Sequence, residues 1–307
     1  MINIDKIYKS YKTINRMDNQ SKVFQDNIVQ NSYAVLMEYL LEAENKYIES
    51  ITGLSTQGLI DERRQNKDDS WKIIRGTGYF ALSLNKLFDS LTYLKQKDMI
   101  LSNANFLDMG CGLGLNSIVA ANQGLNIYGI EINPVLVEGS KQIIQGCKED
   151  NIIDSQIICR IVQGNYFPEE YRILRQNNQS EAVLSEEKYY RDNTRTWRSI
   201  KSVSTQPKAF LYPKTDEHDA YKELDVSLKD IDIMYSYCWA VNVPSILEIF
   251  SKYTKNDAML LIDSAGMPRD MDRLLKNLNL SYNFDKHPYY IANEYFPMNI
   301  VTKNIQS

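Results

Sequence analysis

The sequence predicts an α/β fold with a doubly wound, mostly parallel β-sheet. From residue 105 onward, short buried-strand candidates alternate with helical segments. A glycine-rich turn joins the first of these strands to the helix after it. Strands that alternate with helices form a parallel sheet covered on both faces. The 307-residue chain is long enough for one large domain or for one domain with an appended cap.

The composition excludes several classes of protein. An apolar fraction of 43% and a charged fraction of 24% are ordinary for a globular chain, so wholesale disorder is not expected. The net charge of −4 argues against a globally basic, nucleic-acid-binding protein.

The sequence shows no recognisable metal-ligand pattern, neither a Cys/His cluster nor a strand-end aspartate with a nearby Asp-Asn pair, which predicts that the protein holds no metal. Four scattered cysteines and two histidines form no Cys/His cluster of the kind that binds zinc.

The amino terminus lacks the pattern of an export signal, and no stretch of about 20 residues is continuously apolar. We therefore expect a reduced, cytoplasmic protein with no membrane partner.

The first part of the chain, residues 1–98, is expected to be a helical amino-terminal cap. Apolar residues recur there at the three- and four-residue spacing of amphipathic helices. They are Tyr33, Leu36, Met37, Leu40 and Leu41 in one run, and Leu84, Leu87, Phe88, Leu91 and Leu94 in another.

The remainder, residues 99–307, is expected to be the cofactor-binding domain. Helices are expected over residues 116–122, from Pro134 onward, and over 244–253 and 271–278; Pro134 suits the first turn of a helix. The expected strands are 106–109, 127–131, 157–162, 231–235 and 258–262, with two further strands from the tail at 281–284 and 289–292.

An insertion separates the third strand from the fourth. A crossover between parallel strands normally needs one helix and a few loop residues, whereas residues 165–230 are far longer. Within it, basic residues alternate with aromatic residues between Lys188 and Lys201. We interpret the insertion as a substrate-recognition element or lid above the sheet.

The most informative segment is the glycine-rich turn from Leu107 to Asn116. Its glycines permit conformations closed to other residues, and the following helix presents unpaired N–H groups and its positive dipole end. A dinucleotide fingerprint needs glycine at the first, third and sixth positions. Here the spacing is G-x-G-x-G, with Leu115 at the sixth position. Gly110, Gly112 and Gly114 form this motif, and Asp108 precedes it.

This segment resembles motif I of the class I S-adenosylmethionine-dependent methyltransferases. The resemblance covers roughly residues 71–303 in element order, and its specific motifs lie between Leu107 and Glu131. It implies S-adenosylmethionine as cofactor, with the three glycines against its methionine part. It also implies that Asp108 orients the loop and the cofactor's amino group, and that Glu131, 23 residues further on, accepts both ribose hydroxyls.

The resemblance has one departure after the third strand. The family commonly has an acidic residue there, which contacts the adenine amino group, whereas this chain has Gly164 and Asn165. The side-chain carbonyl of Asn165 can accept the same hydrogen bond, so we expect Asn165 to contact adenine. Tyr79 lies where related enzymes have a helix covering the cofactor, and we expect it to contact cofactor or substrate.

The segment after the fourth strand is expected to line the methyl-transfer centre. Ligands in doubly wound folds sit beyond the carboxyl ends of the strands. Tyr235 and Tyr237 lie there, and aromatic faces attract cations. The Asn-Pro-Pro-Tyr pattern of enzymes that methylate exocyclic or amide nitrogens is missing.

Together these features predict a methyltransferase that acts on an oxygen or nitrogen of a small molecule or of a peptide or protein. Neither His218 nor His287 is marked by its position as a catalytic base. Three alternatives remain open: a cofactor-binding sensor or scaffold without catalysis, a nicotinamide-dependent oxidoreductase, and an aminopropyl transferase. The glycine spacing argues against the oxidoreductase, and missing acidic polyamine ligands argue against the aminopropyl transferase.

Overall fold

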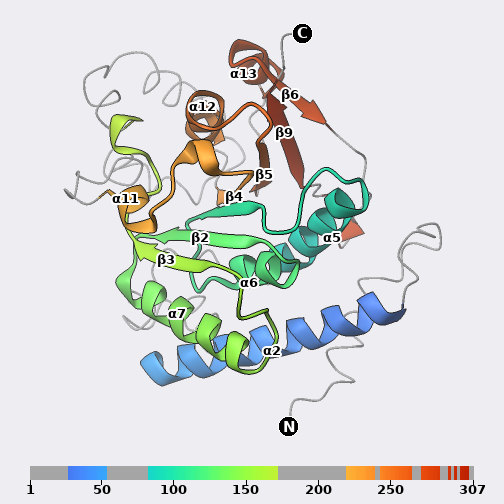
Figure 1. Cartoon of the computed structure of the whole chain (residues 1–307), viewed down its shortest axis with the longest axis vertical. Coiled ribbons are helices and arrows are strands. Elements are labelled where there is room, and N and C mark those ends of the chain that lie inside the picture. The colour runs from blue at the N-terminus through green and yellow to red at the C-terminus, as the bar shows by residue number, and fades with distance from the viewer. Residues whose placement is uncertain are drawn as a thin grey trace. The chain divides into compact units, whose positions relative to one another are not determined.

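The computed structural model of the protein is shown in Figure 1. It describes residues 27–53, 82–171, 219–238, 243–264, 271–283, 290–291, 294–295 and 298–303. The chain divides into two compact units, of which one comprises Met1–Trp71 with Phe284–Pro297 and the other Lys72–Asn283 with Met298–Ser307. The expected division at residue 98 into a cap and a cofactor-binding domain stays a prediction.

The smaller unit contains one long helix and one short hairpin among its described residues. Helix α2 spans Asn27–Thr52, and strands β7 (Tyr290–Ile291) and β8 (Glu294–Tyr295) pair antiparallel. Buried apolar residues recur along α2 at helical spacing, as the sequence predicts. They are Tyr33, Leu36, Leu40 and Ile48.

The larger unit is built on a seven-stranded sheet in the order β3-β2-β1-β4-β5-β9-β6. Its strands are β1 (Asn105–Met109), β2 (Asn126–Glu131), β3 (Cys159–Gln163), β4 (Ile233–Cys238), β5 (Met259–Ser264), β6 (Leu280–Asn283) and β9 (Asn299–Lys303). Strands β1 to β5 pair parallel with one another, whereas β9 lies between β5 and β6 and pairs antiparallel with both. The doubly wound, mostly parallel sheet predicted from the sequence is confirmed.

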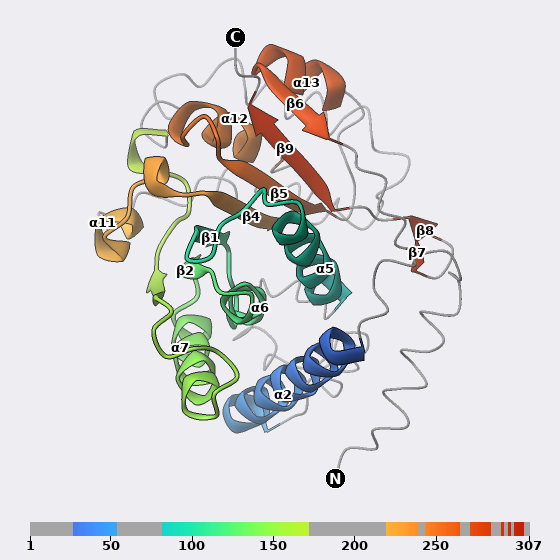
Figure 2. The same ribbon diagram turned by 45° about the vertical axis from the view of Figure 1, so that its right-hand side comes forward.

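Helices cover both faces of this sheet (Figure 2). One face carries α5 (Leu82–Gln96), α6 (Leu115–Asn122) and α7 (Pro134–Glu149). The other carries α11 (Ala220–Leu224), α12 (Val243–Tyr253) and α13 (Met271–Asn277). Because helices cover both faces, β1 and β2 are buried at all but their first residues, and most of their buried side chains are apolar.

Side chains of β1 alternate between these two faces, and this alternation positions the site. Leu107 and Met109 belong to the apolar core that also contains residues of α12. Asp108 lies between them in the strand and points to the opposite face, where it meets α6. A polar side chain is thereby placed under the glycine-rich turn.

The expected strands differ from the structure mainly at their ends. The third begins at Cys159 rather than 157, and the fourth spans 233–238 rather than 231–235. The expected tail strand at 281–284 is confirmed as β6, whereas the one at 289–292 pairs with β8 outside the main sheet. Strand β9 was not expected, although Ile300, Val301 and Thr302 are the β-branched residues typical of strands.

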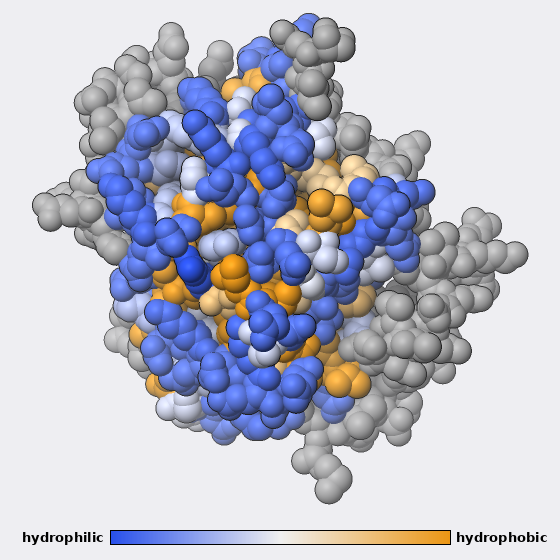
Figure 3. Space-filling model, in the orientation of Figure 1, coloured by the Kyte–Doolittle hydropathy of each residue, from blue (hydrophilic) through white to orange (hydrophobic). Residues whose placement is uncertain are grey.

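The described surface is largely polar on the face that Figure 3 shows. Hydrophobic residues appear on this face mainly towards the middle of the picture, where β2, β3 and α6 lie in Figure 1. Among the described helices, none is long and apolar enough to cross a membrane.

Candidate cofactor-binding site

The site lies at the point in the sheet where the order of the strands changes direction. Strand β1 pairs with β2 on one side and with β4 on the other, so the crossovers leave β1 in opposite directions. In open α/β sheets such a switch point leaves a crevice at the carboxyl ends of the strands. The glycine-rich turn, Glu131 and the turn at Asn165 follow or end β1, β2 and β3.

The glycine-rich turn is attached to the end of β2 by backbone hydrogen bonds. The N–H groups of Gly110 and Cys111 both donate to the carbonyl oxygen of Ile130, at 2.9 and 3.1 Å. The φ angles of Gly110, Gly112 and Gly114 are 79°, 55° and 74°. These values lie in the left-handed region, which glycine adopts at little cost.

Gly114 is also required by close packing at the start of α6. It is the N-cap of α6, and a Cβ built on it would lie 3.1 Å from Cβ of Ser140 in α7. A larger residue would push the two helices apart. The three glycines thus form one tight turn, called the glycine cradle below, in which the space beside Gly112 is open. The expected role of this turn in cofactor binding stays a prediction.

Glu131 holds this loop through its carboxylate. Its Oε2 accepts a hydrogen bond from the Gly112 N–H at 3.0 Å, and its Oε1 accepts one from the Asn133 N–H at 2.9 Å. Glu131 is only 9% exposed, and this burial raises the pKa of its carboxyl while the two N–H donors oppose the rise. An ionised oxygen pair has further lone pairs available for a ligand's hydroxyl groups.

Asp108 is a buried carboxyl beneath the loop. It is 1% exposed, and Oδ2 accepts a hydrogen bond from the Ser117 hydroxyl at 2.8 Å. Desolvation raises the pKa of Asp108 to about 7, and the nearby Glu131 carboxylate contributes to the rise. Within the described part of the chain, no lysine or arginine forms an ion pair with Asp108 or Glu131.

The turn after β3 lies beside the same loop. The Gly164 N–H donates to the Glu131 carbonyl oxygen at 2.9 Å, which joins the ends of β3 and β2. A Cβ on Gly110 would lie 3.8 Å from Cε1 of Tyr166, so the Tyr166 ring lies beside the glycine loop. Asn165, which lies between Gly164 and Tyr166, is therefore close to both Glu131 and the loop.

Several buried polar atoms at this edge have no hydrogen-bond partner among the described residues. They are Oδ1 of Asn116 in α6, Nδ2 of Asn165 after β3, and Oγ of Ser236 in β4. Buried polar atoms are nearly always satisfied, so unpaired ones at a switch point indicate a missing ligand. S-Adenosylmethionine carries amino, carboxyl, ribose and base groups. The site offers them a hydrogen-bond donor, a hydrogen-bond acceptor, two carboxylates and the glycine cradle. The residues present therefore fit the cofactor that the resemblance implies.

The two tyrosines predicted for the transfer centre have different environments. Tyr235 is fully buried and its ring stacks on Phe106 of β1, with centroids 5.9 Å apart. Tyr237, two residues nearer the carboxyl end of β4, is partly exposed. Both lie on the α5–α6 side of the sheet, because residues two apart in a strand share a face.

A buried ion pair lies next to Tyr237. Lys86 of α5 and Asp263 of β5 are 8% and 3% exposed, and the Lys86 Nζ donates to Asp263 Oδ1 at 3.1 Å. Asp263 is the register partner of Tyr237 in the parallel β4–β5 pair. Burial raises the pKa of the Asp263 carboxyl, and the Lys86 charge partly offsets this.

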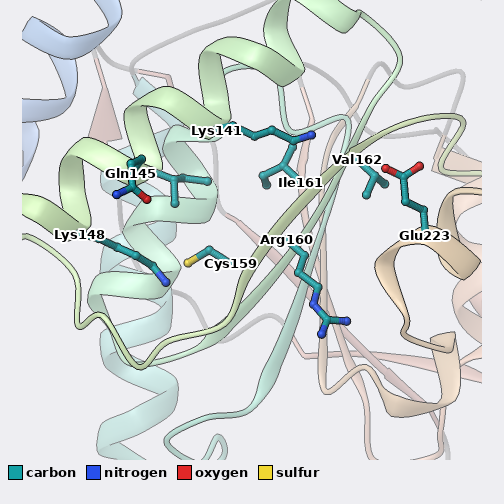
Figure 4. A pocket seen from close by; sticks show the side chains of 9 residues that line it. Lys141, Gln145, Lys148, Cys159, Arg160, Ile161, Val162 and Glu223 are labelled. Atoms are coloured by element: carbon teal, nitrogen blue, oxygen red, sulfur yellow. The ribbon is translucent and has the colours of Figure 1, made fainter.

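A groove of about 370 Å³ lies away from this edge, between α7 and the outer strand β3 (Figure 4). Lys148 in its wall donates to the carbonyl oxygens of Ser155 and Ile157, and Arg160 donates to Leu224 and Asp225. Lys148 and Arg160 thus already have protein partners, and none of the buried atoms without a hydrogen-bond partner in the described part of the chain belongs to a residue that lines this groove.

Two predicted functional elements, Tyr79 and the basic and aromatic run at 188–201, lie outside the described residues. The two histidines, His218 and His287, which the sequence does not mark as catalytic, lie outside them as well. Within the described ranges, no group of three His, Cys, Asp or Glu side chains could hold a metal ion.

Sequence reasoning missed Ser117, Lys86, Asp263 and Ser236. Ser117 could have been found, because it lies one helical turn into α6 and faces β1. The Lys86–Asp263 pair had no local signal, since its members are 177 residues apart.

The sequence profile of the family described as "Methyltransferase domain" matches residues 81–296, more than half of the chain. No curated protein matches the chain significantly.

Several solved structures are similar to the chain at low identity. A TehB-like SAM-dependent methyltransferase from Corynebacterium glutamicum has 14% identity and a TM-score of 0.39, covering 80% of this chain and 97% of that one. The magnesium protoporphyrin IX methyltransferase of Synechocystis, solved with bound SAM, has 10% identity and a TM-score of 0.44, covering 89% and 97%. A ribosomal protein L11 methylase from Lactobacillus delbrueckii subsp. bulgaricus has 10% identity and a TM-score of 0.39, covering 71% and 79%. Similarity this low gives no indication of the acceptor.

Proposed function

Because this chain belongs to the methyltransferase domain family, we propose that it transfers the methyl group of S-adenosylmethionine to an oxygen or nitrogen of a small molecule, peptide or protein. S-Adenosylmethionine is its cofactor. The observation that carries the proposal is the connection between the glycine loop and the carboxylate of Glu131 through the Gly112 N–H. It places a carboxylate and a glycine cradle at one switch point.

The proposed cofactor-binding residues act through groups that the fold has already oriented. Each carboxylate oxygen of Glu131 accepts one backbone N–H and retains capacity for a ribose hydroxyl. Asp108 supports the loop and complements the positive charge of the amino group. The proposed set is Asp108, Gly110, Gly112, Gly114, Glu131 and Asn165, with Tyr79 outside the described residues.

The cofactor supplies a methyl group that its sulfonium has already activated, so this chain has mainly to align the acceptor and exclude water. We assign the alignment of the acceptor to Tyr237, which is partly exposed and lies towards the end of β4. Tyr235 would support it from the core, through its stack on Phe106. Ring faces at this position favour an acceptor that carries or develops positive charge, such as an amine.

Titration calorimetry and a methyl-transfer screen together test this proposal. The full-length protein is titrated with S-adenosylmethionine and S-adenosylhomocysteine, and labelled methyl transfer is measured on pools of amines, phenols, carboxylic acids and peptides. We expect binding of both and transfer to one of these classes. Tight binding without transfer to any acceptor would instead favour a sensor or scaffold, and nicotinamide binding would favour an oxidoreductase.

The insertion at 165–230 is proposed to select the acceptor. Deleting residues 188–201 should impair transfer while sparing affinity for S-adenosylhomocysteine, because the proposed cofactor residues lie outside the deleted segment. Equal loss of both would identify the segment as part of the folding core.

A further inference from the structure

The turn at Asn165 is fixed from several sides. Gly164 packs so closely on α11 that an added Cβ would lie 2.7 Å from Cβ of Ala220. The hydroxyl of Tyr221 donates to the Tyr166 carbonyl oxygen at 2.7 Å. The rings of Tyr166 and Phe167 pack with centroids 4.7 Å apart. Few other arrangements are open to the backbone on either side of Asn165.

The side-chain amide of Asn165 is oriented within this turn. Its Oδ1 accepts a hydrogen bond from the Phe167 N–H at 2.9 Å. Because a backbone N–H can only donate, the atom that faces it must be the amide oxygen, and the other atom is then the NH₂ group. This Nδ2 is buried and has no hydrogen-bond partner among the described residues.

A buried amide donor without a partner costs free energy unless a ligand satisfies it. Such a donor lies here one residue beyond Gly164, whose N–H is bonded to the Glu131 carbonyl oxygen at the end of the neighbouring strand. A nucleoside held at its ribose by Glu131 would bring its base towards the neighbouring strand end. Adenine offers ring nitrogens that can only accept and one exocyclic amino group that donates.

We propose that Asn165 recognises the adenine of the cofactor as a hydrogen-bond donor, from Nδ2 to a ring nitrogen. This inference rests on the proposed function, and it reverses the polarity expected from the sequence. A carboxylate at this position could only accept from the exocyclic amino group. The amide instead donates a hydrogen bond, so Asn165 selects for a base that has an acceptor nitrogen in its ring.

The two polarities predict opposite effects of Asn165→Asp. The new carboxylate can still accept from the Phe167 N–H, so the turn is kept. It replaces the donor by a negative charge facing an acceptor, so affinity for S-adenosylhomocysteine at pH 8 should fall by at least about tenfold. If Asn165 acted through its carbonyl, aspartate would bind equally or more tightly, and that result would overturn the inference.

Base-modified ligands provide a second measurement on the wild-type protein. The 1-deaza, 3-deaza and 7-deaza forms of S-adenosylhomocysteine each lack one ring nitrogen. We expect one of them to bind at least about tenfold more weakly than the parent, and Asn165→Asp to lose this discrimination. Equal affinity of wild type for all four ligands would overturn the inference even if Asn165→Asp failed to fold.

Failure of this inference is distinguishable from failure of the proposed function. Wild-type protein that does not bind S-adenosylhomocysteine at all would contradict the proposed function. Binding that Asn165→Asp leaves unchanged would contradict only the donor role. Thermal melting without ligand, compared between wild type and Asn165→Asp, reports whether the substitution disturbs the fold.

Discussion

Asp108 and Asp263 are both buried aspartates near the carboxyl ends of parallel strands, yet only Asp263 has a cationic partner. Lys86 reaches Asp263 from α5, whereas Asp108 is bonded to the uncharged hydroxyl of Ser117. Burial raises the pKa of both carboxyls, and in Asp263 the Lys86 charge works against that rise. The same residue type thus has its charge compensated at β5 and left uncompensated at β1.

The difference separates a structural charge from a functional one. An ion pair such as Lys86–Asp263 is complete without a ligand and joins a helix to the sheet. An uncompensated buried carboxyl is costly and is retained where function needs it, so it marks the place where a positive ligand group would be stabilising. The cofactor carries such groups in its ammonium and sulfonium.

The largest effect should come from breaking the pair at β5. Lys86→Met leaves the Asp263 charge buried and unpaired, which should lower the free energy of unfolding by about 3–5 kcal/mol. The double variant Lys86→Met/Asp263→Asn should recover much of this loss, because the unpaired charge is gone. Urea denaturation of the wild type and the variants measures both effects. A single-variant loss near zero would mean that the pair has no structural role.

A smaller effect is expected at Glu131, the proposed ribose-binding residue. Glu131→Ala removes a charge-assisted acceptor and should weaken S-adenosylhomocysteine binding by about 1–3 kcal/mol. Glu138→Ala, an exposed position on α7, is the matched control and should leave affinity unchanged. Calorimetric titration of the three proteins gives the comparison. Unchanged affinity of Glu131→Ala would remove this residue from the site.

A third effect concerns the pH dependence of stability without ligand. Because the folded-state pKa of Asp108 lies near 7, above its ordinary value, the folded state binds the proton more tightly than the unfolded state. The contribution of Asp108 to stability is therefore present below about pH 4 and is lost as pH rises to about 7. Asp108→Asn removes this loss, so the stability of the variant should decline less over that range. Parallel curves for both proteins would show that Asp108 is not the titrating group.

The smallest effect is a fraction of one proton released on cofactor binding. If the ammonium of S-adenosylhomocysteine lies beside Asp108, it favours the ionised carboxylate, and binding near pH 7 should release protons. Calorimetry in buffers of different ionisation enthalpy measures this release. Asp263→Asn should retain it if that variant folds, and Asp108→Asn should lose it. A wild type that releases no proton would place the positive charge elsewhere.

Much of the fold and part of the candidate site could be predicted from local sequence. Strands β1 and β2 were located within one residue, because runs that are buried on both faces are mostly apolar. The glycine turn was visible because its spacing and its place between strand and helix are local. Strand β9 was missed, since a short tail segment becomes a strand only by pairing between β5 and β6.

The order of strands and helices, the glycine turn and the acidic ends of β1 and β2 were thus determined by the sequence alone, since each depends on neighbouring residues. Only the tertiary structure decided which buried aspartate has a partner and which way the Asn165 amide faces. The Lys86–Asp263 pair joins residues 177 apart, and the amide orientation depends on a turn held by α11. Such contacts arise from the packing of distant segments, which no local pattern encodes.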